Sequence, residues 1–197
     1  ARRQIFRERY GLSEGEQVVI SVGHTIERKG LLDYIALARQ MPQAKFFWFG
    51  HTPDHLVPKT VRRAMAEAPG NLRFAGYISQ EELRDAYCGA DVFAFLSLEE
   101  TEGIVVLEAL SCGIPTVLRD IPVYQGWIPE GPGIWKARDA LGFRQAVGEA
   151  LAYPLHGADK AGRGIALSRR LEAVGQSLTA IYQKERLVSQ SKNDYQS

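Results

Sequence analysis

Two glutamates, Glu100 and Glu108, stand on either side of Gly103, which opens a predicted helix. Because glycine has no Cβ, a ligand can approach the backbone closely there. The free N–H groups of Gly103, Ile104 and Val105 would form a helix N-terminus, which attracts phosphate. Carboxylates repel phosphate but accept hydrogen bonds from hydroxyl groups. This mixture suits a sugar nucleotide, in which a diphosphate lies between two polyols.

The same acidic residues also have a purely structural interpretation. Glu100 and Glu102 would then be acids that stabilise the start of the helix through its dipole. Glu108 would be an ordinary surface residue on that helix. Physical chemistry alone favours neither interpretation.

Residues 23–30, Gly-His-Thr-Ile-Glu-Arg-Lys-Gly, form a second candidate for binding an anion. The segment follows a predicted strand, but it lacks the spacing of a dinucleotide fingerprint or a P-loop. Arg28 and Lys29 stand at a predicted helix start, where the helix dipole disfavours cations. Neutralising a bound diphosphate would explain both residues, and a solvated turn is the alternative.

The elements that must position these loops alternate between short β-rich runs and helical patterns. Strands are predicted at 17–22, 45–49, 72–75, 91–96 and 115–118, with 134–135 as a candidate sixth. Helices are predicted at 29–41, 57–68, 79–89, 104–112, 137–152, 161–170 and 171–188. Strands that are apolar throughout, alternating with helices, predict an α/β fold: a Rossmann-like parallel sheet with helices on both faces. Ligands of such sheets bind beyond the carboxyl ends of the strands.

Two local signals mark helix ends. Ser79 and Glu82 have the spacing of a capping box at a helix start. Gly113 follows the helix that carries Glu108 and is expected to cap its C-terminus.

The domain organisation is expected to have three parts. Residues 1–15 are interpreted as a linker helix from a missing N-terminal domain, since the chain opens without Met inside an amphipathic pattern. Residues 16–188 are predicted to form the nucleotide-sugar-binding domain. Its last helices, from about residue 161, lack intervening strands and are expected to be an appendage. Residues 189–197 are polar and are predicted to fray.

Composition narrows the class of protein. The 197 residues are 45% hydrophobic and 24% charged, as in a globular domain. A net charge of +1 creates no global field that would attract nucleic acid, so no nucleic-acid partner is expected. The first helix carries a cluster of arginines: Arg2, Arg3, Arg7 and Arg9. The simplest interpretation is a solvated helix face. The alternatives are a surface that binds a membrane or an acidic partner.

The cysteines and histidines suggest neither a disulfide bond nor a metal site. Cys88 and Cys112 are far apart in sequence and do not suggest a disulfide, so a reducing cytosolic setting and buried thiols are expected. His51 and His55 have a spacing that would suit a metal, but no further ligand is near, and no metal is expected. No apolar run approaches the roughly 20 residues that span a bilayer, and the chain starts without a signal peptide.

The acidic loop and its helix carry a specific resemblance. Glu100-x7-Glu108 followed by Ala-Leu-Ser-Cys-Gly-Ile-Pro-Thr-Val at 109–117 resembles the signature of family 4 retaining glycosyltransferases, which have the GT-B fold. Ser21-Val22-Gly23 with Lys29-Gly30 resembles the second donor-binding motif of that family. The resemblance covers about residues 2–183, which would be the C-terminal half of a GT-B fold. Residues 99–110, 119–124, 28–30 and 48–50 are similar to bacterial diacylglycerol glucosyltransferases, which make membrane glucolipids from UDP-glucose.

The resemblance implies roles for the acidic loop and its helix. Glu108 would hold the ribose hydroxyls of the donor, and Glu100 would contact the transferred sugar. The backbone at Gly103, Ile104 and Val105 would meet the diphosphate or the sugar hydroxyls. Both glutamates would then belong to one donor pocket.

Further donor contacts are implied on other loops. Lys29, with Arg28 beside it, would neutralise the diphosphate, and the loop begins at the donor-binding Gly23. The turn Gly76-Tyr77-Ile78-Ser79 would hold the base, partly through its backbone. These assignments complete the donor site implied by the resemblance.

Two residues depart from the pattern of the family. His24 stands where the family usually has arginine, which puts the diphosphate clamp in doubt unless Arg28 compensates. Glu102 replaces the usual aromatic residue of the loop and adds an acid near the transferred sugar. The segment 124–127 is expected to be a packed helix end rather than an acceptor site.

The implied function is that of the donor-binding half of a metal-free, retaining glycosyltransferase. It would take part in transferring a hexose, expected to be glucose from UDP-glucose, to a lipid such as diacylglycerol, in the cytoplasm or on the inner face of the cell membrane. The alternatives are a soluble or polysaccharide acceptor and a non-catalytic α/β nucleotide-binding module. An epimerase lacks a supporting pattern, and a receiver domain would need clustered aspartates where Gly23-His24 stands.

Overall fold

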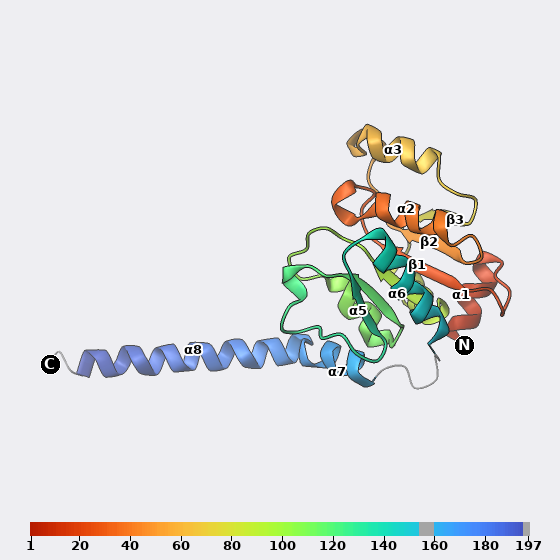
Figure 1. Ribbon diagram of the computed structural model, residues 1–197. Helices are drawn as coiled ribbons and strands as arrows, with labels where there is room; N and C mark the ends of the chain where they lie inside the picture. The colour runs from red at the N-terminus through yellow and green to blue at the C-terminus, as the bar shows by residue number, and fades with distance from the viewer. Residues whose placement is uncertain (154–159, 195–197) are drawn as a thin grey trace.

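Within the residues that the structure describes, 1–153 and 160–194, the computed structural model contains one six-stranded sheet (Figure 1). Neighbouring strands all pair in parallel, in the order β3-β2-β1-β4-β5-β6. This arrangement confirms the predicted Rossmann-like sheet. The strands are β1 Val18–Val22, β2 Lys45–Phe49, β3 Leu72–Gly76, β4 Val92–Phe95, β5 Thr116–Arg119 and β6 Ile134–Ala137.

Helices connect the strands and cover both faces of the sheet (Figure 1). They are α1 Arg2–Tyr10, α2 Leu31–Gln40, α3 Lys59–Ala66, α4 Gln80–Gly89, α5 Ile104–Cys112, α6 Ala140–Ala152, α7 Lys160–Ser168 and α8 Leu171–Asp194. Short 3-10 turns lie at η1 Glu27–Lys29, η2 Asp54–Leu56 and η3 Pro122–Tyr124. Ser79 and Glu82 form the predicted capping box, and Gly113 caps α5 with a φ of 72°.

Three predicted helix starts are wrong by two or three residues. The helix predicted from residue 29 begins at Leu31, because Gly30 takes a left-handed φ of 73° and leaves Lys29 in the preceding 3-10 turn. The helix predicted from 57 begins at Lys59, directly after Pro58. The helix predicted from 137 begins at Ala140, since 134–137 forms β6 and Asp139 caps the helix.

Each strand contributes to two cores, one on each face of the sheet. Val19 of β1 lies in the core under α2, α3 and α6. Val18 and Ile20 lie in the opposite core, under α1, α4 and α5. Because both faces are covered, consecutive strand positions are apolar, as in Val18–Ile20 and Val92–Phe95, and not only every second one.

Helix α1 is an integral part of this second core. Phe6 is 1% exposed, and Arg7 is 5% exposed. Arg3 pairs with Asp91 at 2.8 Å, Arg2 and Arg9 pair with acids of α4, and Arg7 donates to backbone carbonyls. The interpretation of these arginines as a solvated face is therefore wrong for Arg7, which is buried, whereas Arg9 is exposed. The segment predicted as a linker packs firmly onto the domain.

The last two helices form the predicted appendage without strands. Helix α7 packs on α5, whereas α8 extends away from the sheet (Figure 1). The predicted tail at 189–197 begins as helix, since α8 runs to Asp194, and its last three residues lie outside the described ranges. No described helix combines the length and the apolar character that crossing a membrane requires.

Cys88 and Cys112 carry free thiols, as predicted. Both side chains are half-buried rather than buried, which corrects the expectation from sequence. They meet where α4 contacts α5, and a hydrogen bond with Cys112 lowers the pKa of the Cys88 thiol.

Candidate functional site

The order of the strands creates a switch point between β1 and β4. From β1 the chain continues to β2 on one side, and from β4 it continues to β5 on the other. The connections therefore diverge, and the loops that follow β1 and β4 lie side by side at the carboxyl ends of the strands, which is where open α/β sheets bind ligands. These loops are residues 23–30 and 96–103, the two anion-binding candidates from sequence.

Backbone and side-chain hydrogen bonds hold the two loops together. The N–H of Leu98 donates to the carbonyl of Arg28 at 2.8 Å. The hydroxyl of Ser97 lies 3.1 Å from the same carbonyl, and the Arg28 guanidinium donates to the carbonyl of Glu99 at 2.9 Å. Arg28 is exposed and its guanidinium joins the two loops. The switch point is thus one continuous surface.

Lys29 and Glu100 meet at the centre of this surface. The Nζ of Lys29 donates to Oε1 of Glu100 at 2.5 Å, across 71 positions of the chain. Their side chains are only 15% and 8% exposed. The stem of Lys29 runs beside Gly23, and its Nζ lies 5.8 Å from the ring centroid of Phe95. The structure therefore brings together two residues that the sequence predicts as catalytic, and it pairs their charges.

Gly30 allows the first loop to approach β4 this closely. A Cβ at this position would lie 2.0 Å from the carbonyl oxygen of Leu96, and the residue has a φ of 73°. Both the left-handed backbone and the backbone contact require glycine. Lys29 is consequently held against the end of β4.

The N-terminus of α5 is open at the same edge. Gly103 is its N-cap with a φ of 81°, and no side chain caps the first turn. Of the three residues whose amides are predicted to bind the donor, Ile104 is 63% exposed, Val105 is half-buried and Gly103 is buried. The first turn retains the partial positive charge that favours a phosphate.

Sequence reasoning missed Tyr124, which lies directly beneath this turn. A Cβ on Gly103 would approach the Tyr124 hydroxyl to 2.8 Å. The side chain is fully buried, and within the described residues its hydroxyl has no hydrogen-bond partner. Burial raises the pKa of Tyr124, and the nearby charge of Glu100 raises it further. The packed segment agrees with the expectation for 124–127, but the sequence contains no signal that places it under the loop.

Glu108 faces α4 from the second turn of α5. It borders a hollow of about 290 Å³ between the two helices, together with Tyr87 and Arg84. The Tyr87 hydroxyl donates to its Oε2 at 3.1 Å. Burial raises the pKa of Glu108, and the hydrogen bond from Tyr87 lowers it. Glu108 is therefore a half-buried carboxylate with a neutral partner, which the sequence did not anticipate.

The turn predicted to hold the base ends β3. Gly76 accepts a hydrogen bond from the N–H of Gly50 at 2.8 Å, Tyr77 is 81% exposed, and Ile78 packs on the second core. Gly76 also borders a hollow of about 440 Å³ at the carboxyl ends of β1, β2 and β3. Buried Thr25 and Thr52 line the same hollow and were not singled out from the sequence.

The two departures from the motif pattern are both exposed. His24 lies with its Nδ1 3.1 Å from the carbonyl oxygen of His51, and Glu102 lies in the loop before α5. Among the residues that the structure describes, no three histidine, cysteine or acidic side chains gather as a metal site would require.

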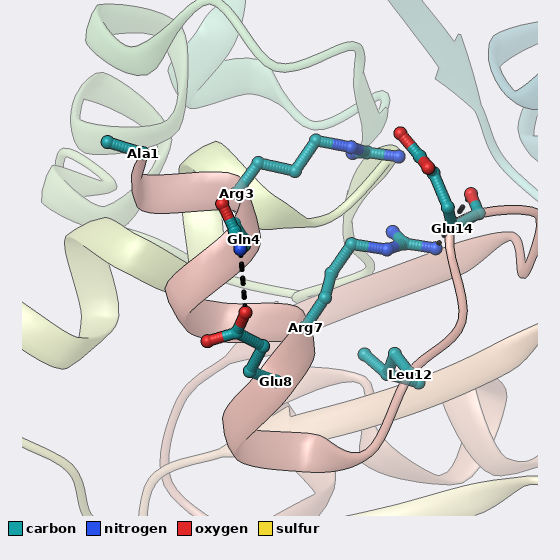
Figure 2. A pocket seen from close by; sticks show the side chains of 7 residues that line it. All are labelled: Ala1, Arg3, Gln4, Arg7, Glu8, Leu12 and Glu14. Atoms are coloured by element: carbon teal, nitrogen blue, oxygen red, sulfur yellow. Dashed lines mark hydrogen bonds between the residues drawn. The ribbon is translucent and has the colours of Figure 1, made fainter.

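A separate hollow of about 490 Å³ lies beside α1 (Figure 2). Figure 2 shows Arg3 and Arg7 extending from this helix toward Glu14. Both arginines already pair with Asp91, Arg3 at 2.8 Å and Arg7 at 3.7 Å, and Arg7 also donates to the carbonyl of Ser13 at 2.6 Å. Asp91 also accepts a hydrogen bond from the N–H at the start of β1, so this hollow lies at the opposite end of the sheet from the two loops.

Comparison with known proteins places these features in a family. Residues 2–138 match the family described as glycosyl transferases group 1. The chain is 36% identical over 179 residues to the processive diacylglycerol alpha-glucosyltransferase of Acholeplasma laidlawii, covering 91% of this chain and 54% of the relative. It is 37% identical over 121 residues to the alpha-galactosylglucosyldiacylglycerol synthase of Streptococcus pneumoniae, covering 58% of this chain and 32% of that relative. The chain thus spans about half the length of the first relative and a third of the second.

Solved structures share the fold. A sucrose-phosphate synthase from Thermosynechococcus elongatus superposes with a TM-score of 0.80 at 25% identity, covering 94% of this chain and 49% of that one. HepE of Anabaena, solved in complex with UDP-glucose, superposes with a TM-score of 0.72 at 18% identity, covering 93% and 52%. The chain therefore belongs to the glycosyl transferases group 1 family and has the Rossmann-like architecture of one half of a GT-B fold.

Proposed function

We propose that this chain is the donor-binding domain of a retaining glycosyltransferase that transfers glucose from UDP-glucose to a lipid such as diacylglycerol. The observation that carries the proposal is the Lys29–Glu100 pair at the switch point, beside the uncapped N-terminus of α5. The same helix carries Glu108 in its second turn, where it lines the hollow toward α4. The names of the two relatives described above, both synthases of diacylglycerol glycosides, support the lipid acceptor.

The diphosphate of the donor would lie over the first turn of α5. The N–H groups of Gly103, Ile104 and Val105 and the helix dipole would favour its negative charge. Lys29 would exchange its contact with Glu100 for a phosphate oxygen, and Arg28 would add a second positive charge nearby. The carboxylate of Glu100, released from Lys29, would then accept hydrogen bonds from the transferred sugar.

The nucleoside would extend toward α4 and the end of β3. Glu108 would accept hydrogen bonds from the ribose hydroxyls, because a carboxylate has two acceptor oxygens and no donor. The turn Gly76-Tyr77-Ile78 would border the base. This direction is supported by the two hollows beside Glu108 and Gly76.

In the reaction, the bond between the anomeric carbon and the β-phosphate oxygen breaks, and its electron pair leaves with the phosphate. A hydroxyl oxygen of the acceptor forms the new bond on the same face of the sugar, and the hydroxyl proton passes to the leaving phosphate. The leaving phosphate gains negative charge, which Lys29, Arg28 and the α5 amides are placed to stabilise without reorganisation. No metal is required in this proposal. A second domain would carry the acceptor site, and its closure would exclude water.

The lipid acceptor implies that the whole enzyme works on the inner face of the cell membrane, as a peripheral protein. A soluble sugar acceptor is the second candidate. It is favoured by the similarity to the mannosylfructose-phosphate synthase of Agrobacterium fabrum, which is 33% identical over 130 residues, 60% of this chain and 28% of that relative.

Calorimetric titration of the 197-residue chain with UDP and UDP-glucose tests the donor site. We expect weak binding of both ligands and no sugar transfer by the chain alone. Absence of heat with millimolar ligand would contradict donor binding, and transfer by the chain alone would contradict the division into two halves.

A pair of matched variants separates a donor domain from a non-catalytic module. Glu108→Gln should weaken UDP binding by about tenfold, since one charge-assisted hydrogen bond is lost. Glu81→Gln is the control, because Glu81 lines the same hollow from α4 but has no proposed role. Equal affinities for all three proteins would remove Glu108 from the site.

A further inference from the structure

The hydrogen bond between Tyr87 and Glu108 connects α4 to the donor-binding helix. The hydroxyl of Tyr87 lies 3.1 Å from Oε2 of Glu108 and 3.2 Å from the carbonyl oxygen of Val105. These two acceptors lie within the first two turns of α5. A single phenolic hydrogen is therefore directed at the part of α5 that is proposed to hold the donor.

The core fixes the position of the Tyr87 ring. The side chain is nearly fully buried, with 2% of the residue exposed. Its ring packs edge-to-face on Phe93 of β4, with 5.5 Å between ring centroids and 74° between planes. Since close packing leaves a buried ring little freedom, the hydroxyl is held at one point relative to the sheet.

Within the described part of the chain, no ion pair with Glu108 is formed, although Arg84 lines the same hollow. The ionisable side chains that line its hollow are Glu81, Arg84 and Tyr87 on α4 and Cys112 on α5. Helix α7, which also packs on α5, presents Ile165 and Ala166 to the shared core. Among the described residues, the hydrogen bond that reaches the Glu108 carboxylate comes from Tyr87.

We propose that Tyr87 is a positioning residue that holds Oε2 of Glu108, so that Oε1 is directed at the hydroxyls of the donor nucleoside; this role rests on the proposed function. Tyr87 lines the same hollow as Glu108, but only 2% of the residue is exposed, and its hydroxyl is directed at α5. Its effect on the donor acts entirely through Glu108.

The same hydrogen bond favours the charged form of the carboxylate. Burial raises the pKa of Glu108, and donation from Tyr87 lowers it. Only the ionised carboxylate is a pure acceptor, whereas the protonated acid carries a donor. Loss of the Tyr87 hydroxyl should therefore weaken the donor most at acidic pH, where Glu108 becomes protonated.

Tyr34 offers a matched control for a purely structural role. It is fully buried on the other face of the sheet, and its hydroxyl donates at 3.0 Å to the carbonyls of Val19 and Phe47. Tyr34→Phe removes a buried phenolic hydroxyl, as Tyr87→Phe does. The two variants differ in whether the lost hydrogen bond reaches Glu108.

The deciding measurement is the titration of the Glu108 side-chain carboxyl carbon by NMR, without ligand. In Tyr87→Phe the midpoint should rise by about one pH unit, the size expected for a lost hydrogen bond to a charged group. It should be unchanged in Tyr34→Phe. An unchanged midpoint in Tyr87→Phe would overturn the inference. If that variant does not fold, the phenolic carbon of Tyr87 in the parent chain should shift with the Glu108 titration, and a constant shift would overturn it equally.

UDP titration then connects the positioning to binding. Tyr87→Phe should weaken UDP by about tenfold at acidic pH and by less at pH 8. In the Glu108→Gln background the same substitution should have little further effect, because the two changes remove one shared interaction. Additive effects would overturn the inference. Failure of the parent chain to bind UDP would instead contradict the proposed function, while the carboxyl titration still decides the role of Tyr87.

Discussion

Glu100 and Glu108 differ in their surroundings although both belong to one Glu-x7-Glu motif. Glu100 is nearly buried and forms an ion pair with Lys29, a residue of the loop after β1. Glu108 is half-buried and accepts a hydrogen bond from the neutral hydroxyl of Tyr87. One carboxylate therefore has its charge compensated by a cation, whereas the other is ionised against the cost of burial. Two side chains of the same type therefore differ in how their charge is balanced.

The difference follows from where each residue lies on the fold. Glu100 is at the switch point between β1 and β4, where the cationic loop arrives. Glu108 is one turn into α5 and faces α4, whose nearest polar group is a phenol. We infer that the compensated carboxylate can release its partner to a phosphate, while the uncompensated one binds hydroxyl groups throughout.

The largest effect should come from separating the two loops. Gly30→Ala forces a left-handed φ on alanine and drives its Cβ to 2.0 Å from the Leu96 carbonyl. We expect the free energy of unfolding to fall by about 4 kcal/mol, from the backbone cost together with overpacking. Urea denaturation measures it. Gly11→Ala is the control, because Gly11 has a similar φ of 66° but nothing within 4 Å of the added Cβ. A loss no greater than that of the control would show that the loops are not in contact.

A smaller loss should follow from removing the cation of the pair. Lys29→Met leaves Glu100 ionised and unpaired, and should lower the free energy of unfolding by about 2 kcal/mol, less than for a fully buried pair because some water reaches it. Arg63→Met is the matched control: it breaks the exposed pair with Glu67 and should cost under about 0.5 kcal/mol. If the second change Glu100→Gln restores stability to Lys29→Met, the loss comes from the unpaired charge of Glu100. Equal losses in Lys29→Met and Arg63→Met would contradict a stabilising role for the Lys29–Glu100 pair.

The smallest change in the free energy of unfolding is expected for Glu108→Gln, and its sign is opposite to that of the two changes above. Burial raises its pKa in the folded state, so the folded protein binds the proton more tightly than the unfolded chain. As the pH rises from the pKa of Glu108 in the unfolded chain through its higher pKa in the folded protein, the titration of Glu108 therefore lowers the free energy of unfolding. Glu108→Gln should remove this decline, so that stability at pH 8 is unchanged or slightly higher while UDP binding weakens.

Denaturation at pH 4 and pH 8 checks this sign. Glu81→Gln, on the exposed start of α4, should retain the pH dependence of the parent chain. A Glu108→Gln variant that is less stable than the parent at pH 8 would show that the ionised carboxylate is a net stabilising group, contrary to the comparison.

Local signals predicted much of the fold. The apolar runs at 17–22 and 45–49 became β1 and β2, and the box of Ser79 and Glu82 capped α4 as expected. The helix expected from residue 29 began two residues later, because Gly30 ends a 3-10 turn in the left-handed conformation and lies against the carbonyl of Leu96, 66 positions away. The solvated face assigned to the first helix was wrong for Arg7 for a similar reason, since the arginines of this helix pair with acids on α4 and before β4.

The sequence alone determined the residue types of the site, their loops, and the parallel α/β class, because these depend on patterns within about twenty neighbouring positions. Only the tertiary structure decided which side chains meet. The strand order places the loop after β1 beside the loop after β4, so Lys29 reaches Glu100. The packing of α4 on α5 brings Tyr87 to Glu108, and η3 carries Tyr124 beneath Gly103. Such pairings depend on how distant elements pack, and no periodicity within one segment encodes them.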